Sequence, residues 1–292
     1  MVEFYDPVAG KNISYHIAPI ALRLWDNLRE DKLKRMNEDR VYIVDGRERT
    51  GKSSFAFQQA KYIDPTFTLE NICFKPEDFL DRIRNAPQGS VIVFDEAFRG
   101  LSSKGSRSKV NKAIVQALME VGQRNLIIFI VLPTIFLLEI YAAVFRSEAL
   151  FHIYKTKKKM SSGARVRAFK VYNYKNKKYL YLRGKTKYFS YAQPKIRKEK
   201  GEFYVKKNET YPAGIPYETF DMDAYNKKKA IAFKSSPEAN EEENKYQQSY
   251  YKLVRIYREE NKLSETETSE RLIKKGVQIS PSMVGKICRE YT

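Results

Sequence analysis

A chain of 292 residues is long enough to bury a full hydrophobic core, and we expect it to divide into two or three folding units. Its net charge of +19 is far from that of an average soluble domain, and it favours a polyanionic partner, either nucleic acid or an acidic membrane. The two cysteines, Cys73 and Cys288, are too few and too far apart for a zinc site or a disulfide framework, which is typical of a reducing compartment.

Ahead of residue 40 the sequence predicts a short lead-in over residues 1–14 and a packing helix over residues 19–39. Residues 1–11 lack the apolar core of a signal peptide. We therefore expect a cytoplasmic protein, in the host cytoplasm if the protein is viral.

Residues 41–57, VYIVDGRERTGKSSFAF, are an apolar run followed by a glycine-bounded loop and a helix-forming segment. The loop fits G-x-x-x-x-G-K-[ST], the Walker A pattern, in which glycines let backbone N–H groups point at phosphate oxygens. Lys52 can reach the outer phosphates as a catalytic group, and the Ser53 hydroxyl can bind Mg²⁺. The expected cofactors are ATP and Mg²⁺, and the alternative is a lysine-bearing surface turn. The predicted nucleotide-binding residues are Gly46, Arg47, Glu48, Arg49, Thr50, Gly51, Lys52, Ser53 and Ser54.

A second chemical landmark follows a predicted helix over residues 76–85. Residues 91–94 are an apolar strand run that ends in Asp95 and Glu96. This pattern is typical of a Walker B strand, in which Asp95 assists the metal and Glu96 activates the attacking water. The alternative is a strand that simply ends in polar residues.

Residues 99–112, RGLSSKGSRSKVNK, are polar and basic, and the sequence predicts a loop there, with a helix over residues 111–121. Because the loop leaves the edge of the sheet that carries the catalytic carboxylates, its cations are candidates for contact with DNA. A solvated loop is an equally good interpretation. The DNA-binding candidates in this loop are Arg99, Lys104, Arg107 and Lys109.

The apolar stretch LIIFIVLPTIFLLEIYAAVF, residues 126–145, has about the ~20 residues that a membrane span requires. Pro133 interrupts it, and Glu139 would lie near the centre of the lipid, where a carboxylate is costly. A buried strand followed by a core helix explains the same residues, so we expect no membrane partner.

Residues 39–154 resemble the HerA/FtsK class of ring-forming DNA motor ATPases, and are also similar to viral genome-packaging and zonular-occludens-toxin-like ATPases. The resemblance rests on the two motifs and on Arg124, which stands before an apolar strand, residues 126–132. It implies a RecA-like P-loop core, an oligomeric ring, and a catalytic Arg124 that reaches the neighbouring subunit's triphosphate. The class usually ends this strand with a polar sensor, where this chain has Leu132, Pro133 and Thr134. Thr134 is the substitute sensor candidate. Arg146 is a second sensor candidate and the alternative to Arg124 as the arginine that reaches the neighbouring subunit; a surface ion pair is the alternative for either arginine.

From residue 155 the composition changes to lysine and tyrosine. Between residues 155 and 234 there are 23 Lys and Arg against 6 Asp and Glu. Alternation over residues 164–174, 179–183 and 187–191 predicts a small β meander that binds nucleic acid through its lysines, with most tyrosines in its own core.

The end of the chain reads as a linker and three helices. Residues 234–245 are acidic and polar, which predicts a linker. Ser264 and Glu267 form a capping-box pattern, Gly276 ends that helix, and Ser280-Pro281 starts the last one. The arrangement resembles a helix-turn-helix, with a helical docking module as the alternative. Its DNA-binding candidates are Ser282, Lys286 and Arg289, together with Ser280.

The sequence therefore predicts an α/β protein with a mainly parallel sheet, in four segments. These are a P-loop ATPase core over residues 1–154, a basic β-rich segment over 155–233, a linker over 234–245 and a helix-turn-helix-like domain over 246–292. The predicted function is an ATP-hydrolysing motor, an oligomeric ring that translocates DNA, double-stranded in our expectation, in genome packaging or transfer. The alternatives are an ATP-dependent DNA-assembly switch of the transposition or partition type, or a membrane-associated phage assembly ATPase.

Overall fold

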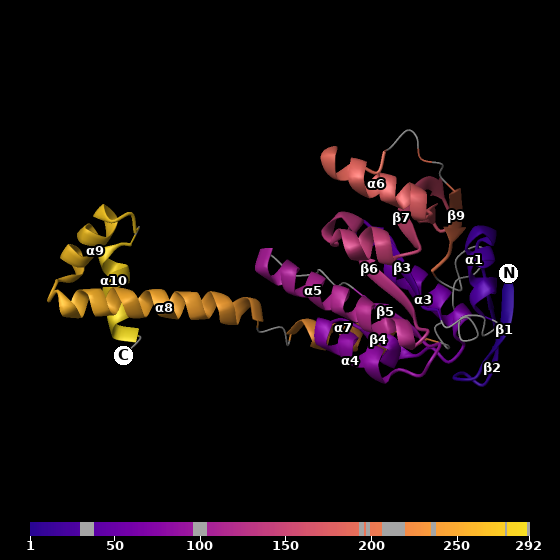
Figure 1. Cartoon of the computed structure of the whole chain (residues 1–292), viewed down its shortest axis with the longest axis horizontal. Coiled ribbons are helices and arrows are strands. Elements are labelled where there is room, and N and C mark those ends of the chain that lie inside the picture. Colours follow the sequence, from indigo (N-terminus) through magenta and orange to yellow (C-terminus); the bar gives the residue numbers. More distant parts are fainter. Residues whose placement is uncertain are drawn as a thin grey trace. The chain divides into compact units, whose positions relative to one another are not determined.

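The computed structural model describes residues 1–29, 38–95, 104–192, 196, 199–205, 220–234, 238–277 and 279–290. The chain divides into two compact units, Met1–Phe233 and Lys234–Thr292. Each unit has its own hydrophobic core. Figure 1 shows the helices and strands of both units.

Within the described part of the first unit, seven strands form the main sheet. The neighbours from β4 to β7 pair in parallel, and β8 and β9 extend the sheet in antiparallel fashion. The phosphate-loop strand β3 lies beside β6, which separates it from β5, in agreement with the predicted RecA-like core. In sheet order the strands are β4 (Ile72–Cys73), β5 (Val91–Phe94), β6 (Ile127–Leu132), β3 (Arg40–Gly46), β7 (Ala149–Lys159), β8 (Arg165–Tyr172) and β9 (Glu199–Phe203).

Helices cover both faces of this sheet, which explains why its central strands are apolar on both sides. One face packs against α1 and α3 and the other against α4, α5 and α6, so alternate residues of β3 enter different cores. Tyr42 and Val44 lie in the first core, and Val41 and Ile43 lie in the second. The helices of this unit are α1 (Pro19–Arg29), α3 (Lys52–Ile63), α4 (Pro76–Asn85), α5 (Lys104–Glu120), α6 (Tyr174–Thr186) and α7 (Met222–Lys234).

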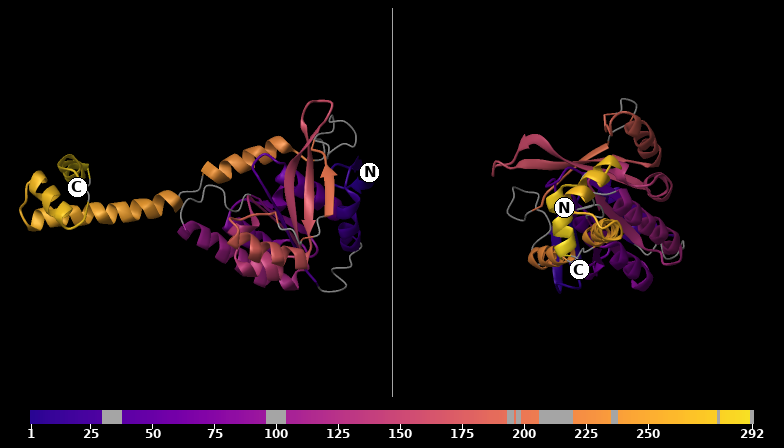
Figure 2. Two further views of the ribbon diagram at one scale, coloured as in Figure 1. Left: turned by 90° about the horizontal axis from the view of Figure 1, so that it is seen from above. Right: turned by 90° about the vertical axis from the view of Figure 1, so that its left-hand side faces the viewer.

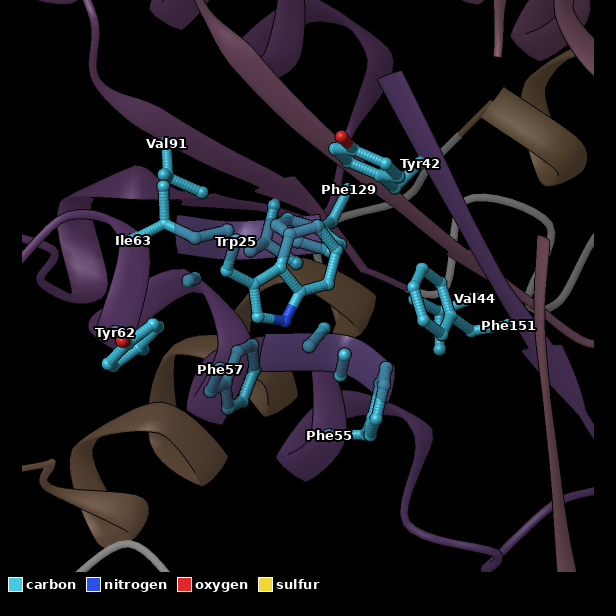
Figure 3. Close-up of a cluster of buried hydrophobic side chains, with 14 of the residues drawn as sticks. Trp25, Tyr42, Val44, Phe55, Phe57, Tyr62, Ile63, Val91, Phe129 and Phe151 are labelled. Atoms are coloured by element: carbon cyan, nitrogen blue, oxygen red, sulfur yellow. The ribbon is translucent and has the colours of Figure 1, made fainter. Parts of the chain in front are cut away.

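Trp25 of α1 is the centre of the first core (Figure 3). Its ring lies 4.9 Å from that of Tyr42 and 5.7 Å from that of Phe129, both edge-on. Its indole N–H donates to the Gln59 side chain at 2.7 Å, which satisfies the polar atom of a fully buried ring. The helix predicted over residues 19–39 is confirmed from Pro19 to Arg29 and is wrong at residues 38–39, which are not helical and directly precede β3; residues 30–37 lie outside the described part.

The predicted lead-in is a hairpin of β1 (Val2–Asp6) and β2 (Lys11–Tyr15). It packs on α3, where the Tyr15 hydroxyl donates to the Gln58 carbonyl at 2.5 Å. A buried ion pair joins Lys61 to Asp6 at 2.9 Å on the same side of the helix.

The apolar stretch over residues 126–145 is confirmed as a buried strand, β6. The core helix predicted after it is a 3₁₀ turn, Ile135–Leu137, and a single π-helical segment, Tyr141–Arg146. Pro133 ends the strand and breaks the continuity that a spanning helix needs. No helix within the described ranges has both the length and the apolar character to cross a membrane.

The basic loop predicted over residues 99–112 is wrong from Lys104 onward, because α5 starts there. Its lysines and serines are compatible with a helix whose apolar positions begin only at Val110. Arg99 lies outside the described residues, and Lys104, Arg107 and Lys109 occupy backbone positions of α5 whose side chains also lie outside them.

The meander predicted after residue 155 is also wrong in two of its three strands. β8 matches the first one, whereas the residues expected at 179–183 lie in α6, and those at 187–191 form no strand. The boundary expected after Tyr154 falls inside β7, which continues to Lys159 and pairs with both β3 and β8. Figure 2 shows the β7–β8 hairpin extending past its neighbours. The basic segment is therefore part of the first unit.

The second unit consists, in its described part, of α8 (Glu238–Glu260), α9 (Glu265–Lys274) and α10 (Pro281–Glu290). The linker predicted over residues 234–245 is helical from Glu238, while residues 235–237 lie outside the described part. The capping box of Ser264 and Glu267 is confirmed, and Gly276 adopts a φ of +85° after α9. The three helices and the segment between α9 and α10 form a small apolar core: Tyr251, Val254, Leu272, Ile279, Val284 and Ile287.

Candidate nucleotide site

The phosphate loop connects the end of β3 to the start of α3, as the sequence predicts. Gly46 has a φ of +141°, and a Cβ added there would lie 2.2 Å from the carbonyl oxygen of Ile153. Gly51, at the N-terminus of α3, has a φ of +94°. Both values belong to backbone conformations that side chains oppose, so the two glycines of the motif are required by the fold itself.

The side chains of the loop are held by the loop's own backbone. The Thr50 hydroxyl donates to the Arg47 carbonyl at 2.8 Å, and the Lys52 ammonium donates to the same oxygen at 2.9 Å. Arg47, Glu48 and Arg49 are exposed. Lys52 thus stands at the mouth of the loop in a hydrogen bond that a bound phosphate can replace.

The structure brings Ser53 and Asp95 together from positions 42 residues apart. The Ser53 hydroxyl donates to Oδ1 of Asp95 at 3.0 Å, and Asp95 is fully buried at the end of β5. A serine hydroxyl and a carboxylate are the oxygen ligands that Mg²⁺ prefers. The residues present therefore fit a nucleotide with its magnesium ion. Glu96 lies outside the described residues. Ser54 follows Ser53 in the first turn of α3 and is half-buried.

Two side chains that no sequence motif marks join this site, Tyr225 by direct contact with Asp95 and Lys229 through Tyr225. The Tyr225 hydroxyl of α7 donates to Oδ2 of Asp95 at 2.5 Å, and the Lys229 ammonium donates to that hydroxyl at 3.1 Å. No local motif marks them, because α7 lies some 130 residues after Asp95 in the chain.

Arg167 is a third residue near the phosphate loop that no sequence pattern marks. A Cβ added to Gly51 would lie 3.0 Å from Cδ of Arg167 and 3.4 Å from the ring of Phe203. These two residues are paired across β8 and β9. The antiparallel extension of the sheet therefore lies directly against the N-terminus of α3.

The two arginine candidates lie at the end of the parallel strands opposite the phosphate loop. Arg124 lies three residues before β6 begins, and Arg146 lies three residues before β7; both strands run parallel to β3, whose far end carries the phosphate loop. Arg124 is exposed and donates to the Ala86 carbonyl at 3.3 Å. Arg146 forms an ion pair with Asp39 and donates to the Leu118 carbonyl at 3.0 Å. Neither reaches the phosphate loop of its own chain.

Thr134, the sensor candidate, lies at the same edge as the phosphate loop, but its hydroxyl is already engaged. It contacts the Tyr191 hydroxyl at 2.8 Å, and Tyr191 donates to Asp45. Asp45 also accepts from Ile135 N at 2.8 Å and contacts Nδ1 of His152 at 2.7 Å. Burial, together with the Asp45 carboxylate, raises the pKa of Tyr191 well above its ordinary value, so the phenol remains a donor in this network.

The DNA-binding candidates of the second unit lie on α10. Ser282 and Lys286 are exposed, on the side away from the buried Val284 and Ile287. The Ser280 hydroxyl contacts that of Ser282 at 3.0 Å and accepts from Met283 N, so it caps the helix. The side chain of Arg289 lies outside the described part.

The sheet order and the glycine loop together define a P-loop nucleotide-binding fold. No family model matches the chain, and no curated protein matches it by sequence.

Two solved structures are similar to it at low identity. One is the N-terminal domain of zonular occludens toxin from Neisseria meningitidis, with 13% identity and a TM-score of 0.34 over 58% of this chain and 96% of that one. The other is the Legionella pneumophila ATPase DotB, with 11% identity and a TM-score of 0.29 over 58% of this chain and 56% of that one. These values are too low to carry activity or partners across, and the HerA/FtsK resemblance stays a prediction.

Proposed function

We propose that this protein is a Mg²⁺-dependent ATPase, and the pairing of Ser53 with Asp95 beside the phosphate loop is the observation that carries the proposal. Bound Mg²⁺ neutralises the charge that develops on the phosphate oxygens during phosphoryl transfer. The chain's part is to hold that ion with Ser53 and Asp95, and to cradle the phosphates with the loop N–H groups and Lys52. Glu96 orients and deprotonates the attacking water.

We further propose that the partner is DNA and that the ATPase works as an oligomeric ring. The support for a polyanion is the charge of +19 and its location. Around the end of the β7–β8 hairpin, the cations are exposed: Lys155, Lys157, Lys158, Lys159 and Arg165. The support for a ring is Arg124, which is exposed and lies at the opposite end of the parallel strands from its own phosphate loop, so a role in hydrolysis would require the site of a neighbouring subunit.

The ATPase rate with and without duplex DNA, over a series of salt concentrations, tests the proposal. We expect DNA to stimulate hydrolysis, the stimulation to fade with salt, and Lys52→Ala to abolish hydrolysis altogether. A wild-type rate that DNA leaves unchanged at low salt would contradict the DNA assignment. Hydrolysis that persists in Lys52→Ala would contradict the site.

A mixing experiment tests the action of Arg124 across subunits. Arg124→Ala and Glu96→Gln are each expected to lack activity, because each removes one half of a shared site. In a mixture, some interfaces combine an intact Glu96 with an intact Arg124 from the neighbour, and activity should return. A mixture as inactive as its components would show that Arg124 does not act in trans.

Motion along DNA is separable from ATP-dependent assembly on it. A translocating motor displaces the third strand of a triplex from the duplex, whereas an assembly switch hydrolyses ATP on DNA and leaves the triplex intact. The displacement assay with wild type, and with Glu96→Gln as the hydrolysis-deficient control, decides between the two.

A further inference from the structure

Both oxygens of the Asp95 carboxylate are hydrogen-bonded, and the two donors come from different parts of the chain. Ser53, on α3, donates to Oδ1 at 3.0 Å, and Tyr225, on α7, donates to Oδ2 at 2.5 Å. Asp95 is fully buried. A carboxylate with both oxygens bonded has its plane fixed, so Tyr225 determines which oxygen Asp95 presents on the side of Ser53.

The position of Tyr225 is itself fixed by packing. The side chain is 3% exposed, and its ring lies 5.1 Å from Phe57 and 5.7 Å from Phe74. The helix that carries it is anchored by Lys228, whose ammonium donates to the carbonyls of Leu69 at 2.7 Å and Ile72 at 2.8 Å. The phenol therefore reaches Asp95 from a rigid element, as a positioning group requires.

Lys229, one turn further along α7, completes a chain of three groups. Its ammonium donates to the Tyr225 oxygen at 3.1 Å and lies 5.3 Å from the centre of the ring. A cation that donates to a phenol oxygen polarises the O–H bond, and this strengthens the bond that the phenol donates to the carboxylate. Lys229 acts on Asp95 through Tyr225.

We propose that Tyr225 is a positioning residue of the metal site, that it holds Asp95 with Oδ1 toward Ser53 for Mg²⁺, and that Lys229 reinforces it. The inference rests on the proposed function, because it needs nucleotide and Mg²⁺ at this site. It adds a residue from the C-terminal end of the first unit to a site that the motifs place in the first hundred residues.

Nucleotide binding, measured on the full chain as a function of free Mg²⁺, tests the proposal. The readout is the affinity for a fluorescent ATP analogue, first in EDTA and then along a Mg²⁺ titration. In Tyr225→Phe, which keeps the ring and loses the hydroxyl, we expect the affinity in EDTA to stay within about twofold of wild type. The Mg²⁺ concentration for half-maximal enhancement should rise about tenfold, as is usual when a partner of a metal ligand is removed.

Tyr62→Phe is the matched control, because it removes another phenol–carboxylate hydrogen bond, from Tyr62 to Asp26 at 2.8 Å, away from the site. It should leave the Mg²⁺ dependence unchanged. Lys229→Met is expected to give a smaller shift of the same sign, and Lys227→Met, which removes an exposed lysine of the same helix, should give none.

The outcomes distinguish a failure of the proposed Mg²⁺ site from a failure of the positioning role of Tyr225. If wild type binds the nucleotide without any effect of Mg²⁺, the proposed function and this inference both fail. If wild type depends on Mg²⁺ and Tyr225→Phe follows the same curve, only the positioning role fails. Should Tyr225→Phe not fold, Lys229→Met decides, and a curve equal to wild type overturns the proposal.

Discussion

Lys61 is the most deeply buried cation of α3, and it joins three segments of the chain. Its ammonium lies 2.9 Å from the Asp6 carboxylate, and both side chains have zero exposure. It also donates to the carbonyls of Pro65 at 2.7 Å and Phe67 at 3.2 Å, in the turn after α3. The Lys61 ammonium therefore links the N-terminal hairpin, α3 and that turn.

Removing one member of this pair should be strongly destabilising, because the other charge is left buried without its partner. We expect Lys61→Met, and separately Asp6→Asn, to lower the free energy of unfolding by about 3–5 kcal/mol, measured by urea denaturation. The double variant should lose less than the sum of the two single losses.

Arg84→Met is the comparison, since it breaks the exposed ion pair with Glu120 and should shift the urea midpoint far less. Equal shifts for Lys61→Met and Arg84→Met would contradict the role given to the buried pair.

Single residues of the site were predictable where a local pattern carries the chemistry. The glycines of the loop, Lys52 and Ser53 are marked by their spacing, and Asp95 by the apolar strand before it. Tyr225 and Arg167 were not predictable, because their partners are distant in sequence and their own surroundings look like ordinary basic helix and strand. Thr134 follows β6 at the end of the strands that carries the phosphate loop. Its hydroxyl contact with Tyr191 could not be predicted, because Tyr191 lies 57 residues later in the chain.

At the scale of elements, α6 shows why alternation of lysine and tyrosine misled the strand prediction. Its buried positions are Lys177, Leu180, Tyr181 and Gly184, which have the i, i+3, i+4, i+7 spacing of a helix. A lysine and a glycine occupy two of the four positions, so the stripe is hard to recognise from hydrophobicity. Tyr181 nevertheless behaves as core, since its hydroxyl donates to the Leu138 carbonyl at 2.7 Å.

Lys177 of α6 is expected to make the stability of the fold depend on pH. The ammonium donates to the carbonyl and the hydroxyl of Ser147 in a fully buried position. Burial lowers the pKa of Lys177 to about 7, and attraction to the Glu148 carboxylate only partly opposes this. In the unfolded chain the pKa is about 10.4.

The sign of the effect follows from these two values. The cost of burying a charged lysine is present in full below about pH 7, and it disappears as the pH rises toward ~10.4, because the folded state no longer binds the proton. The wild type should therefore gain stability relative to Lys177→Met between about pH 7.5 and 9.5, by at most about 1.4 kcal/mol per pH unit.

Urea denaturation of both proteins across that range measures the difference, with Lys175→Met, an exposed position of the same helix, as the control. Parallel pH profiles for wild type and Lys177→Met would show that the lysine keeps an ordinary pKa.

At the scale of the whole first unit, the sheet does not end with the parallel strands of the nucleotide-binding core. β7 pairs in parallel with β3 and in antiparallel with β8, so one strand belongs to both halves of the sheet. Composition changes at residue 155, but the backbone pairing continues, and for this reason composition alone placed a boundary inside a strand. The consequence is that the most basic part of the unit is joined rigidly to the strand beside the phosphate loop.

This connection leads to a prediction about where DNA binds. If the hairpin holds DNA, replacing Lys157, Lys158 and Lys159 together by Gln should weaken DNA binding. The slope of log affinity against log salt should fall by about 0.9 for each phosphate that the variant no longer neutralises. The ATPase rate without DNA should not change, because these side chains are exposed and lie beyond the pairing of β7 with β3.

A matched variant makes the comparison specific. Replacing Lys175, Lys178 and Lys187 by Gln removes the same charge from exposed positions on or just after α6. If both variants bind DNA equally weakly, net charge alone attracts DNA and the hairpin is not its site. If only the hairpin variant binds DNA more weakly, and its DNA-stimulated ATPase falls as well, the hairpin is the DNA site, and β7 is the strand that joins it to the nucleotide-binding core.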